Sequence, residues 1–179
     1  MKLAFAGKMR SGKNAAASFF TEDTTVELGF SDEFKQLAKV YFPQEVAKGK
    51  PRPIYQFIGQ GFRQFDPDIW VKCLDRKLIN LMESGVSDFI VTDVRQMNEY
   101  SYLKKKGFTV IKVEAEEEIR KERIIAAGDT FKPESFYHET ELSVDFLPCD
   151  YLVTNNTTLE DLYEQLQFIR KELEGDGQT

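Results

Sequence analysis

The sequence predicts an α/β fold in which five parallel strands form one sheet and helices cover both of its faces. Short apolar segments alternate along the chain with segments of helical periodicity, the pattern of parallel strands joined by helices. The first apolar segment runs directly into a glycine-rich loop and then into an alanine-rich helix. With 179 residues, 41 % of them hydrophobic, the chain has the size of a single domain with a substantial core.

The first strand, expected at 3–6, leads into the loop Gly7-Lys-Met-Arg-Ser-Gly12-Lys13. Glycine at both ends of this loop permits backbone angles that turn successive N–H groups inward around a phosphate. Lys13 adds a positive charge, and the helix that begins at Asn14 adds its positive end. Strand, loop and helix in this order predict a P-loop, and hence the three-layer α/β fold that P-loop kinases share with switches and ATPases. Asn14 stands where the pattern has Ser or Thr, and its amide oxygen can reach a metal ion directly or through water.

Four further strands are expected at 25–30, 88–93, 109–113 and 151–154. Ser31-Asp32 predicts the start of a helix that ends at Pro43, and a loop is expected at 44–53. The segment 52–63 is expected to be part helix and part loop. Later helices are expected from Asp66-Pro-Asp68 to about 84, at 98–106, at 116–128, and from a Thr157/Glu160 capping box to about 173.

Asp93 ends one of the apolar strands, at the edge where an open parallel sheet places its ligand-binding residues. Its carboxylate is expected to hold magnesium-bound water or an incoming donor group, because a P-loop requires a supporting carboxylate. Arg95, two residues further on, can reach an anion. The alternative is that Asp93 only caps the helix that starts near Gln96.

The single domain, 1–179, is expected to contain an acceptor-binding insert at about 34–70 and a lid at about 129–147. In the insert, aromatic residues alternate with Arg and Gln, which suits a planar base and its phosphate; a solvated face is the alternative. Trp70 is a candidate for ligand stacking, although its apolar neighbours favour the core. Arg120 and Arg123 share a helix face and could bring charge from the lid side, unless they only pair with nearby glutamates.

The net charge of −6 argues against a general binder of nucleic acid or anionic membranes, because such proteins carry a basic field. No apolar run is long enough to span a membrane, and no signal peptide is expected. Cys73 and Cys149 are isolated, as expected for reduced thiols of a cytoplasmic protein. The expected partners are therefore small molecules, and a monomer and a homodimer are both compatible with the sequence.

In their order along the chain, these motifs resemble those of the phage-type deoxynucleoside monophosphate kinases and, more distantly, of animal-type phosphomevalonate kinase. The similar segments are the glycine loop, Ser31-Asp32 with Lys35, Arg52 with Gln56 and Gly59, Asp66-Pro-Asp-Ile-Trp70, Thr92-Asp-Val-Arg95 with Asn98-Glu99, and His138-Glu-Thr-Glu141. The sequence departs from the family at Asn14, at Gln96-Met97, where Phe-Pro is common, and in the last segment, where the family has His-Pro-Ser-Glu.

The resemblance implies transfer of the γ-phosphate of ATP, bound with Mg²⁺, to a deoxynucleoside or nucleoside monophosphate. A phosphate oxygen is already a competent nucleophile, so catalysis requires positioning and charge neutralisation rather than a general base. The residues expected to act in catalysis are Lys13, Arg10, Asp93, Arg95, Arg120 and Arg123, with Asn14 and Asp93 supporting the metal. The expected nucleotide site contains Gly7, Lys8, Met9, Ser11, Gly12, Lys13, Asn14, Ala15 and Asn155, and the acceptor site contains Asp32, Lys35, Arg52, Gln56, Arg63 and Trp70.

Two alternatives remain open on the sequence. One is a kinase for another small acceptor, such as phosphomevalonate or dephospho-coenzyme A. A hydroxyl acceptor would require a carboxylate base, for which Asp32 and Asp93 are the candidates. The other is a nucleotide-binding regulatory protein with weak turnover, which the departures from the family at Asn14 and in His138-Glu-Thr-Glu141 leave open.

Overall fold

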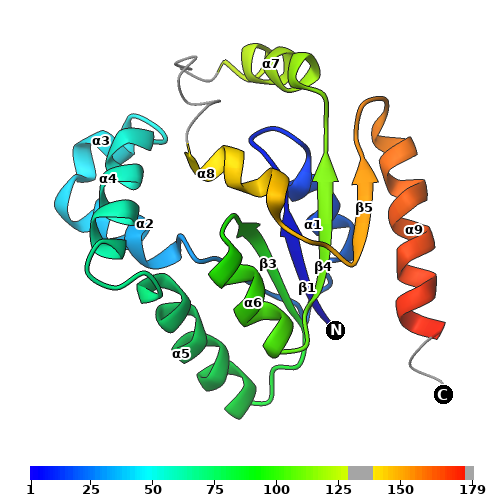
Figure 1. The fold of residues 1–179 in the computed structure, drawn as a ribbon, viewed down its shortest axis with the longest axis horizontal. Helices are drawn as coiled ribbons and strands as arrows, with labels where there is room; N and C mark the ends of the chain where they lie inside the picture. Colours follow the sequence, from blue (N-terminus) through cyan, green and yellow to red (C-terminus); the bar gives the residue numbers. More distant parts are fainter. Residues whose placement is uncertain (129–138, 176–179) are drawn as a thin grey trace.

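The sheet at the centre of the molecule confirms the predicted fold class (Figure 1). A computed structural model describes residues 1–128 and 139–175. Five strands pair in parallel in the order β2-β3-β1-β4-β5, so the strand that precedes the glycine loop is central. The strands are β1 (Lys2–Ala6), β2 (Val26–Leu28), β3 (Phe89–Val94), β4 (Thr109–Glu114) and β5 (Tyr151–Thr154).

The helices occupy the intervals between the strands, and the 3₁₀ turn η2 (Ser143–Phe146) precedes β5. They are α1 (Lys13–Phe20), α2 (Asp32–Tyr41), α3 (Pro43–Ala47), α4 (Arg52–Arg63), α5 (Ile69–Glu83), α6 (Met97–Lys105), α7 (Glu117–Ala126), α8 (Glu139–Leu142) and α9 (Leu159–Gly175). None of the described helices is long and apolar enough to cross a membrane.

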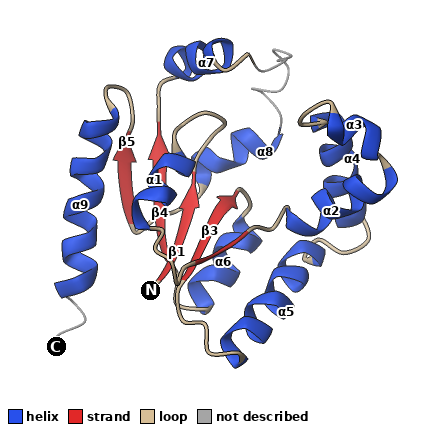
Figure 2. Cartoon of the chain, turned by 180° about the vertical axis from the view of Figure 1, so that it is seen from behind, coloured by secondary structure: helices blue, strands red, loops and turns tan. Residues whose placement is uncertain are grey.

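Two apolar clusters, one on each face of the sheet, explain the three layers. Alternate residues of a strand point to opposite faces, so Ala4 of β1 packs with α5 and α6, whereas Phe5 packs with α1 and α9. Helix α6 lies in front of the sheet in Figure 1, and α1 lies in front of it in the reverse view of Figure 2. Burial of these alternating faces fixes the register of the parallel strands.

Three details of the expected secondary structure are wrong. The expected loop at 44–53 contains helix α3, and the segment expected to be part loop forms the continuous helix α4. The cap of α9 lies one residue further on, where Thr158 and Asp161 exchange hydrogen bonds of 3.1 and 3.2 Å. Within the expected lid, residues 139–146 form α8 and η2, and Val144 and Leu147 are buried. The rest of the expected lid, 129–138, lies outside the described residues.

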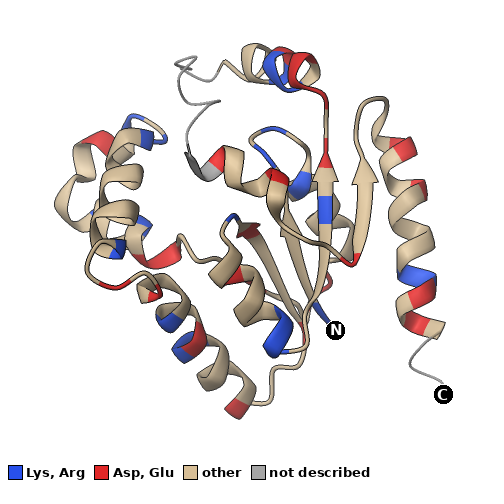
Figure 3. Cartoon of the chain, in the orientation of Figure 1, with Lys and Arg blue, Asp and Glu red and all other residues tan. Residues whose placement is uncertain are grey.

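Helices α2, α3 and α4 stand beside the sheet, while α7 lies beyond the carboxyl ends of its strands (Figure 1). Between them, basic residues of the glycine loop, of the end of β3 and of the α3–α4 segment surround one region (Figure 3). Loops at the carboxyl ends of parallel strands form the ligand sites of open α/β sheets. The fold therefore gathers these basic residues where a ligand is expected.

Candidate active site

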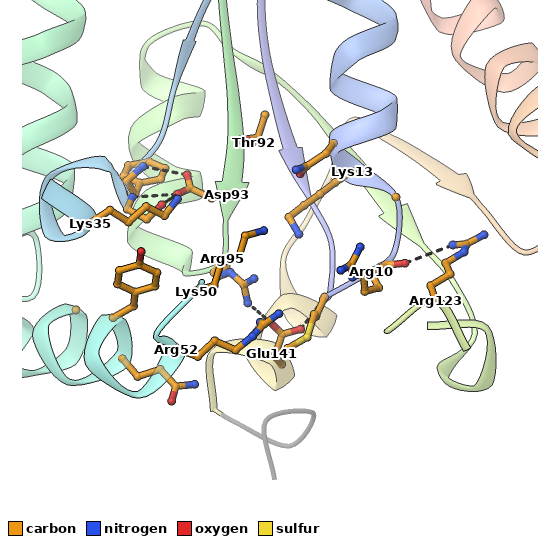
Figure 4. A pocket seen from close by; sticks show the side chains of 18 of the residues that line it. Arg10, Lys13, Lys35, Lys50, Arg52, Thr92, Asp93, Arg95, Arg123 and Glu141 are labelled. Atoms are coloured by element: carbon orange, nitrogen blue, oxygen red, sulfur yellow. Dashed lines mark hydrogen bonds and ion pairs between the residues drawn. The ribbon is translucent and has the colours of Figure 1, made fainter. Parts of the chain in front are cut away.

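A pocket of about 1060 Å³ opens at the carboxyl ends of β1 and β3, between the glycine loop and helices α2 and α4 (Figure 4). Its described lining contains eight basic side chains but only three acidic ones. This excess of positive charge suits ligands that carry several phosphate charges. The basic residues are Arg10, Lys13, Lys35, Lys50, Arg52, Arg63, Arg95 and Arg123, and the acids are Asp93, Glu99 and Glu141.

Most of the predicted site residues line this pocket. Besides Asp93 and the seven predicted basic residues among the eight above, they are Met9, Gly12, Asn14, Ala15, Gln56 and Asn155. Four others line a second cavity of about 340 Å³ beside the glycine loop, namely Gly7, Lys8, Ser11 and Arg120. Asp32 and Trp70 line neither cavity.

Gly12 is the residue on which the shape of the glycine loop most depends. Its φ angle is +102°, a left-handed conformation that residues with a side chain rarely adopt. A Cβ atom at this position would lie 2.0 Å from Nδ2 of Asn155. Gly12 also begins α1, and no described side chain caps this helix end, so the N–H groups of the first turn are available to an anion.

Side chains from outside the loop hold three of its successive carbonyl groups. Arg120 donates to the backbone oxygen of Met9 at 3.5 Å. Arg123 donates to the backbone oxygen of Arg10 at 3.3 Å. Asn155 donates to the oxygen of Ser11 at 2.9 Å. In a trans peptide the C=O and N–H groups point in opposite directions, so the N–H groups of Arg10 and Gly12 face away from these side chains. This is the backbone arrangement that a phosphate cradle needs.

These contacts show where Arg120 and Arg123 lie, the two arginines that were expected to act from the lid side. Arg120 is 4 % exposed, also donates to the oxygen of Ala115 at 3.1 Å, and lies outside the pocket. Arg123 lines the pocket and additionally donates to both oxygens of Asn155, at 3.0 and 3.2 Å. Both side chains therefore support the glycine loop from α7.

Lys13 and Arg95 carry positive charges close together near the centre of the pocket (Figure 4). Burial lowers the pKa of Lys13 to about 8, and the charge of Arg95 adds to this effect. Glu141 and Asp93 oppose the shift without cancelling it. A phosphate bound here would add further negative charge beside these two cations and would stabilise the protonated form of Lys13.

Asp93 binds the segment that precedes α2. Its Oδ1 accepts the N–H of Phe30 at 2.9 Å, and its Oδ2 accepts the N–H and hydroxyl of Ser31 at 2.9 and 2.5 Å. The alternative that Asp93 caps α6 is therefore wrong, because the carboxylate of Glu99 accepts the N–H of Gln96 instead. Asp93 therefore fixes the segment before α2 to the end of β3.

Arg63, a predicted acceptor residue, forms an ion pair with Glu99 at 2.8 Å. Glu99 is 2 % exposed and also accepts the N–H of Arg95 at 2.7 Å, so this pair joins α4 to the loop after β3. Within the described residues, Nε of Arg63 is buried without a hydrogen-bond partner. Arg63 thus lines the pocket with one donor still unused.

Replacing Arg63 with Ala is expected to lower the free energy of unfolding by about 3 kcal/mol at pH 8, because the buried carboxylate of Glu99 loses its cation. Burial, together with the charge of Asp93, raises the pKa of Glu99 to about 7. At pH 6 the carboxyl group can take up a proton in the variant, so the loss should be smaller there. Urea unfolding at both pH values measures the difference, with Arg76→Ala on the exposed side of α5 as control. Equal losses at both pH values would contradict this explanation.

Trp70 and Asp32, which were predicted to bind the acceptor, instead make contacts between elements of the protein and do not line the pocket. The indole N–H of Trp70 donates to the oxygen of Gly59 at 2.9 Å, and its ring packs edge-on against Phe34, with 5.3 Å between centroids. Trp70 therefore joins α5 to the helices beside the pocket. Asp32 accepts the N–H of Gly29 at 3.0 Å and pairs with Lys77 of α5 at 3.1 Å.

The sequence analysis missed Lys50, Glu99 and Glu141 as pocket residues. The capping box of Gln96 and Glu99 is visible in the sequence as an acid three residues after a helix start, and could have been found. Glu141 had no comparable local signal, because its partner Met9 lies 132 positions earlier.

Comparison with known proteins relates this chain to a family of kinases. The model of a family described as deoxynucleotide monophosphate kinase matches residues 33–166, a range that begins after the glycine loop. The chain is also similar to the deoxynucleotide monophosphate kinase of Escherichia phage RB69, with 27 % identity over 105 residues, which cover 59 % of this chain and 37 % of that protein. It is 26 % identical over 157 residues to uncharacterized protein ORF77 of Ictalurid herpesvirus 1 (strain Auburn), covering 87 % of this chain and 64 % of ORF77. The chain thus spans less than two thirds of the length of these relatives.

Solved structures support the fold. The chain resembles the crystal structure of a sugar kinase from Janibacter sp. HTCC2649, with a TM-score of 0.58 and 18 % identity. The match covers 94 % of this chain and 93 % of that chain, so it extends over both layers of helices and the sheet.

Proposed function

The chain belongs to the deoxynucleotide monophosphate kinase family, as its motifs predicted, and we propose that it transfers the γ-phosphate of ATP to a deoxynucleoside or nucleoside monophosphate. The observation that carries this proposal is the shared pocket in which the glycine loop faces the basic residues of α2 and α4 across Arg95. A donor and an acceptor that both carry phosphates fit such a pocket, with the transferred group between them.

In the proposed reaction an oxygen of the acceptor phosphate forms a bond to the γ-phosphorus, while the bond from that phosphorus to the β-phosphate oxygen breaks. The products are the diphosphate and ADP. Lys13, Arg10 and the N–H groups of the glycine loop hold the donor phosphates, and Arg95 meets the transferred group. Lys35, Arg52 and Gln56 bind the acceptor from α2 and α4.

The residues of the glycine loop fit a nucleotide bound with Mg²⁺, because Gly12 and the held carbonyl groups leave N–H donors for phosphate oxygens. Asn14 lines the pocket from the first turn of α1 and offers an amide oxygen to the metal. Oδ1 of Asp93 accepts one described hydrogen bond, which leaves a lone pair for a metal-bound water. When bound, Mg²⁺ would neutralise part of the charge on the β- and γ-phosphates.

The test is to measure ADP formation from ATP and Mg²⁺ with a panel of nucleoside and deoxynucleoside monophosphates, beside phosphomevalonate and dephospho-coenzyme A. Strong stimulation by one or a few monophosphates is expected, and would name the acceptor. Stimulation only by one of the other two acceptors would replace the proposed substrate class. ATP binding without stimulation by any acceptor would overturn the kinase proposal.

ATP affinity is expected to fall as the pH rises through about 8, because the low pKa of Lys13 removes its positive charge in this range. Nucleotide phosphates are fully ionised well below this pH, so the loss belongs to the protein. If Lys13 is the one group that titrates, the Kd for ATP should rise about tenfold for each pH unit above pH 8. Titration calorimetry between pH 7 and 9.5 measures the slope, and Lys13→Arg should abolish it. A flat wild-type profile would contradict the assignment.

A further inference from the structure

Glu141 connects the two sides of the pocket. Its Oε2 accepts the N–H of Met9, in the glycine loop, at 2.6 Å. Its Oε1 accepts from the guanidinium of Arg95, on the loop after β3 (Figure 4). The residue is 3 % exposed and comes from α8, an element that belongs to neither side. A single buried carboxylate therefore determines where the arginine stands relative to the glycine loop.

The segment that carries Glu141 is itself firmly held. The hydroxyl of Ser143 donates to the oxygen of Arg95 at 3.0 Å. Asp145 pairs with Lys8 at 2.7 Å, and its backbone oxygen accepts from Lys112 of β4 at 3.1 Å. With Val144 buried between these contacts, the position of Glu141 is set by β4 and the glycine loop.

The charge of Glu141 balances two cations that would otherwise repel each other. Burial alone would raise the pKa of Glu141, but the charge and hydrogen bond of Arg95, the N–H of Met9 and the charge of Lys13 together hold it below its ordinary value. The side chain is therefore ionised at neutral pH. Without this carboxylate, the positive charge of Arg95 would face that of Lys13 with less compensation, and the guanidinium of Arg95 would lose its ion pair with Glu141.

We propose that Glu141 is a positioning residue for phosphoryl transfer, which holds Arg95 in line with the glycine loop so that the arginine meets the transferred phosphate. This inference rests on the proposed kinase function. In this proposal Glu141 acts by positioning Arg95 and does not itself contact either substrate. Because Glu141 is an anion within a phosphate site, its charge opposes ATP binding while its geometry favours the reaction.

Glu141→Gln is the decisive variant, since it keeps the size of the side chain and an acceptor for the Met9 N–H but removes the charge. We expect kcat to fall about 10- to 100-fold while the KM for ATP stays the same or decreases. A residue that only supported the fold would instead raise this KM and lower kcat together. Glu141→Asp, which restores the charge on a shorter side chain, should recover part of the lost kcat. Unchanged kcat in Glu141→Gln would overturn the proposal.

A double-mutant cycle with Arg95→Ala tests whether Glu141 acts through this arginine. The double variant should have the kcat of Arg95→Ala alone, within about threefold, whereas independent effects would multiply. Glu164→Gln is the matched control, because Glu164 is an exposed acid of α9 that does not line the pocket, and its kcat should equal that of the wild type. If the wild-type chain phosphorylates no acceptor, the affinity for a fluorescent ATP analogue can be measured in the same four proteins. That measurement still tests the coupling between Glu141 and Arg95. Additive effects there would overturn the inference independently of the reaction.

Discussion

Lys13→Ala is expected to reduce kcat about 10³-fold or more, the largest effect of any single substitution in this chain. Lys13 is the basic residue that extends from the glycine loop toward the centre of the pocket, where Arg95 and Glu141 meet (Figure 4). Its ammonium group would stabilise negative charge that shifts onto the phosphates as the bond to the leaving oxygen breaks. Steady-state ADP formation with the accepted monophosphate measures the loss.

The fold of this variant should persist, because the lysine side chain lies at the pocket and not in either apolar cluster. Thermal unfolding checks this point. Lys72→Ala, which removes an exposed lysine from α5, controls for the loss of one positive charge and should retain wild-type turnover. A Lys13→Ala protein with near-normal turnover would contradict the proposed function.

Asp93→Asn is expected to reduce kcat/KM for the monophosphate on the order of 10²-fold, since a hydrogen bond to a charged acceptor contributes about 1.5–3 kcal/mol. The carboxylate accepts three hydrogen bonds from Phe30 and Ser31, and an amide group would turn N–H donors toward some of them. The start of α2 should then lose its fixed position, which weakens the acceptor side of the pocket. Acceptor saturation curves at a fixed high ATP concentration measure the change.

The same variant separates two roles of Asp93. A role in holding the acceptor segment predicts a raised KM for the monophosphate at an ordinary Mg²⁺ requirement. A role in metal binding predicts the reverse, with Mn²⁺ restoring part of the rate. Asp150→Asn is the control, because Asp150 accepts the N–H of Val110 at 2.7 Å at the amino ends of β4 and β5, away from the pocket. That change should affect stability without affecting kcat/KM.

The strands and the glycine loop were predictable because their signals are local. A short apolar run bounded by glycine or polar residues predicts a buried parallel strand, and five such runs became β1 to β5. The helices beside the pocket were harder to predict, because Pro43 and Pro53 suggested loops. Both prolines instead occupy the first turns of α3 and α4, where the missing N–H group has no partner to lose.

The contacts that organise the pocket could not be predicted from local patterns. Asp93 was expected at the edge of the sheet, and it lies there, but nothing near it in sequence indicates its bonds to Phe30 and Ser31. The same holds for Glu141, whose partners are brought together only by the packed sheet. Residue type and strand position predicted which side chains gather in the pocket, whereas their pairing depends on tertiary packing.

The side chains that hold the glycine loop come from much later in the chain. Arg120, Arg123 and Asn155 follow the carbonyl groups that they bind by 111, 113 and 144 positions. A ribosome adds about 5–20 residues per second, so the loop is made several seconds before the residues that shape it. The nascent chain therefore has no finished phosphate cradle until residue 155 has been added. A ligand that depends on the shape of this loop can therefore stabilise the chain only after its sheet is complete, and the proposed nucleotide would not assist the early steps of folding.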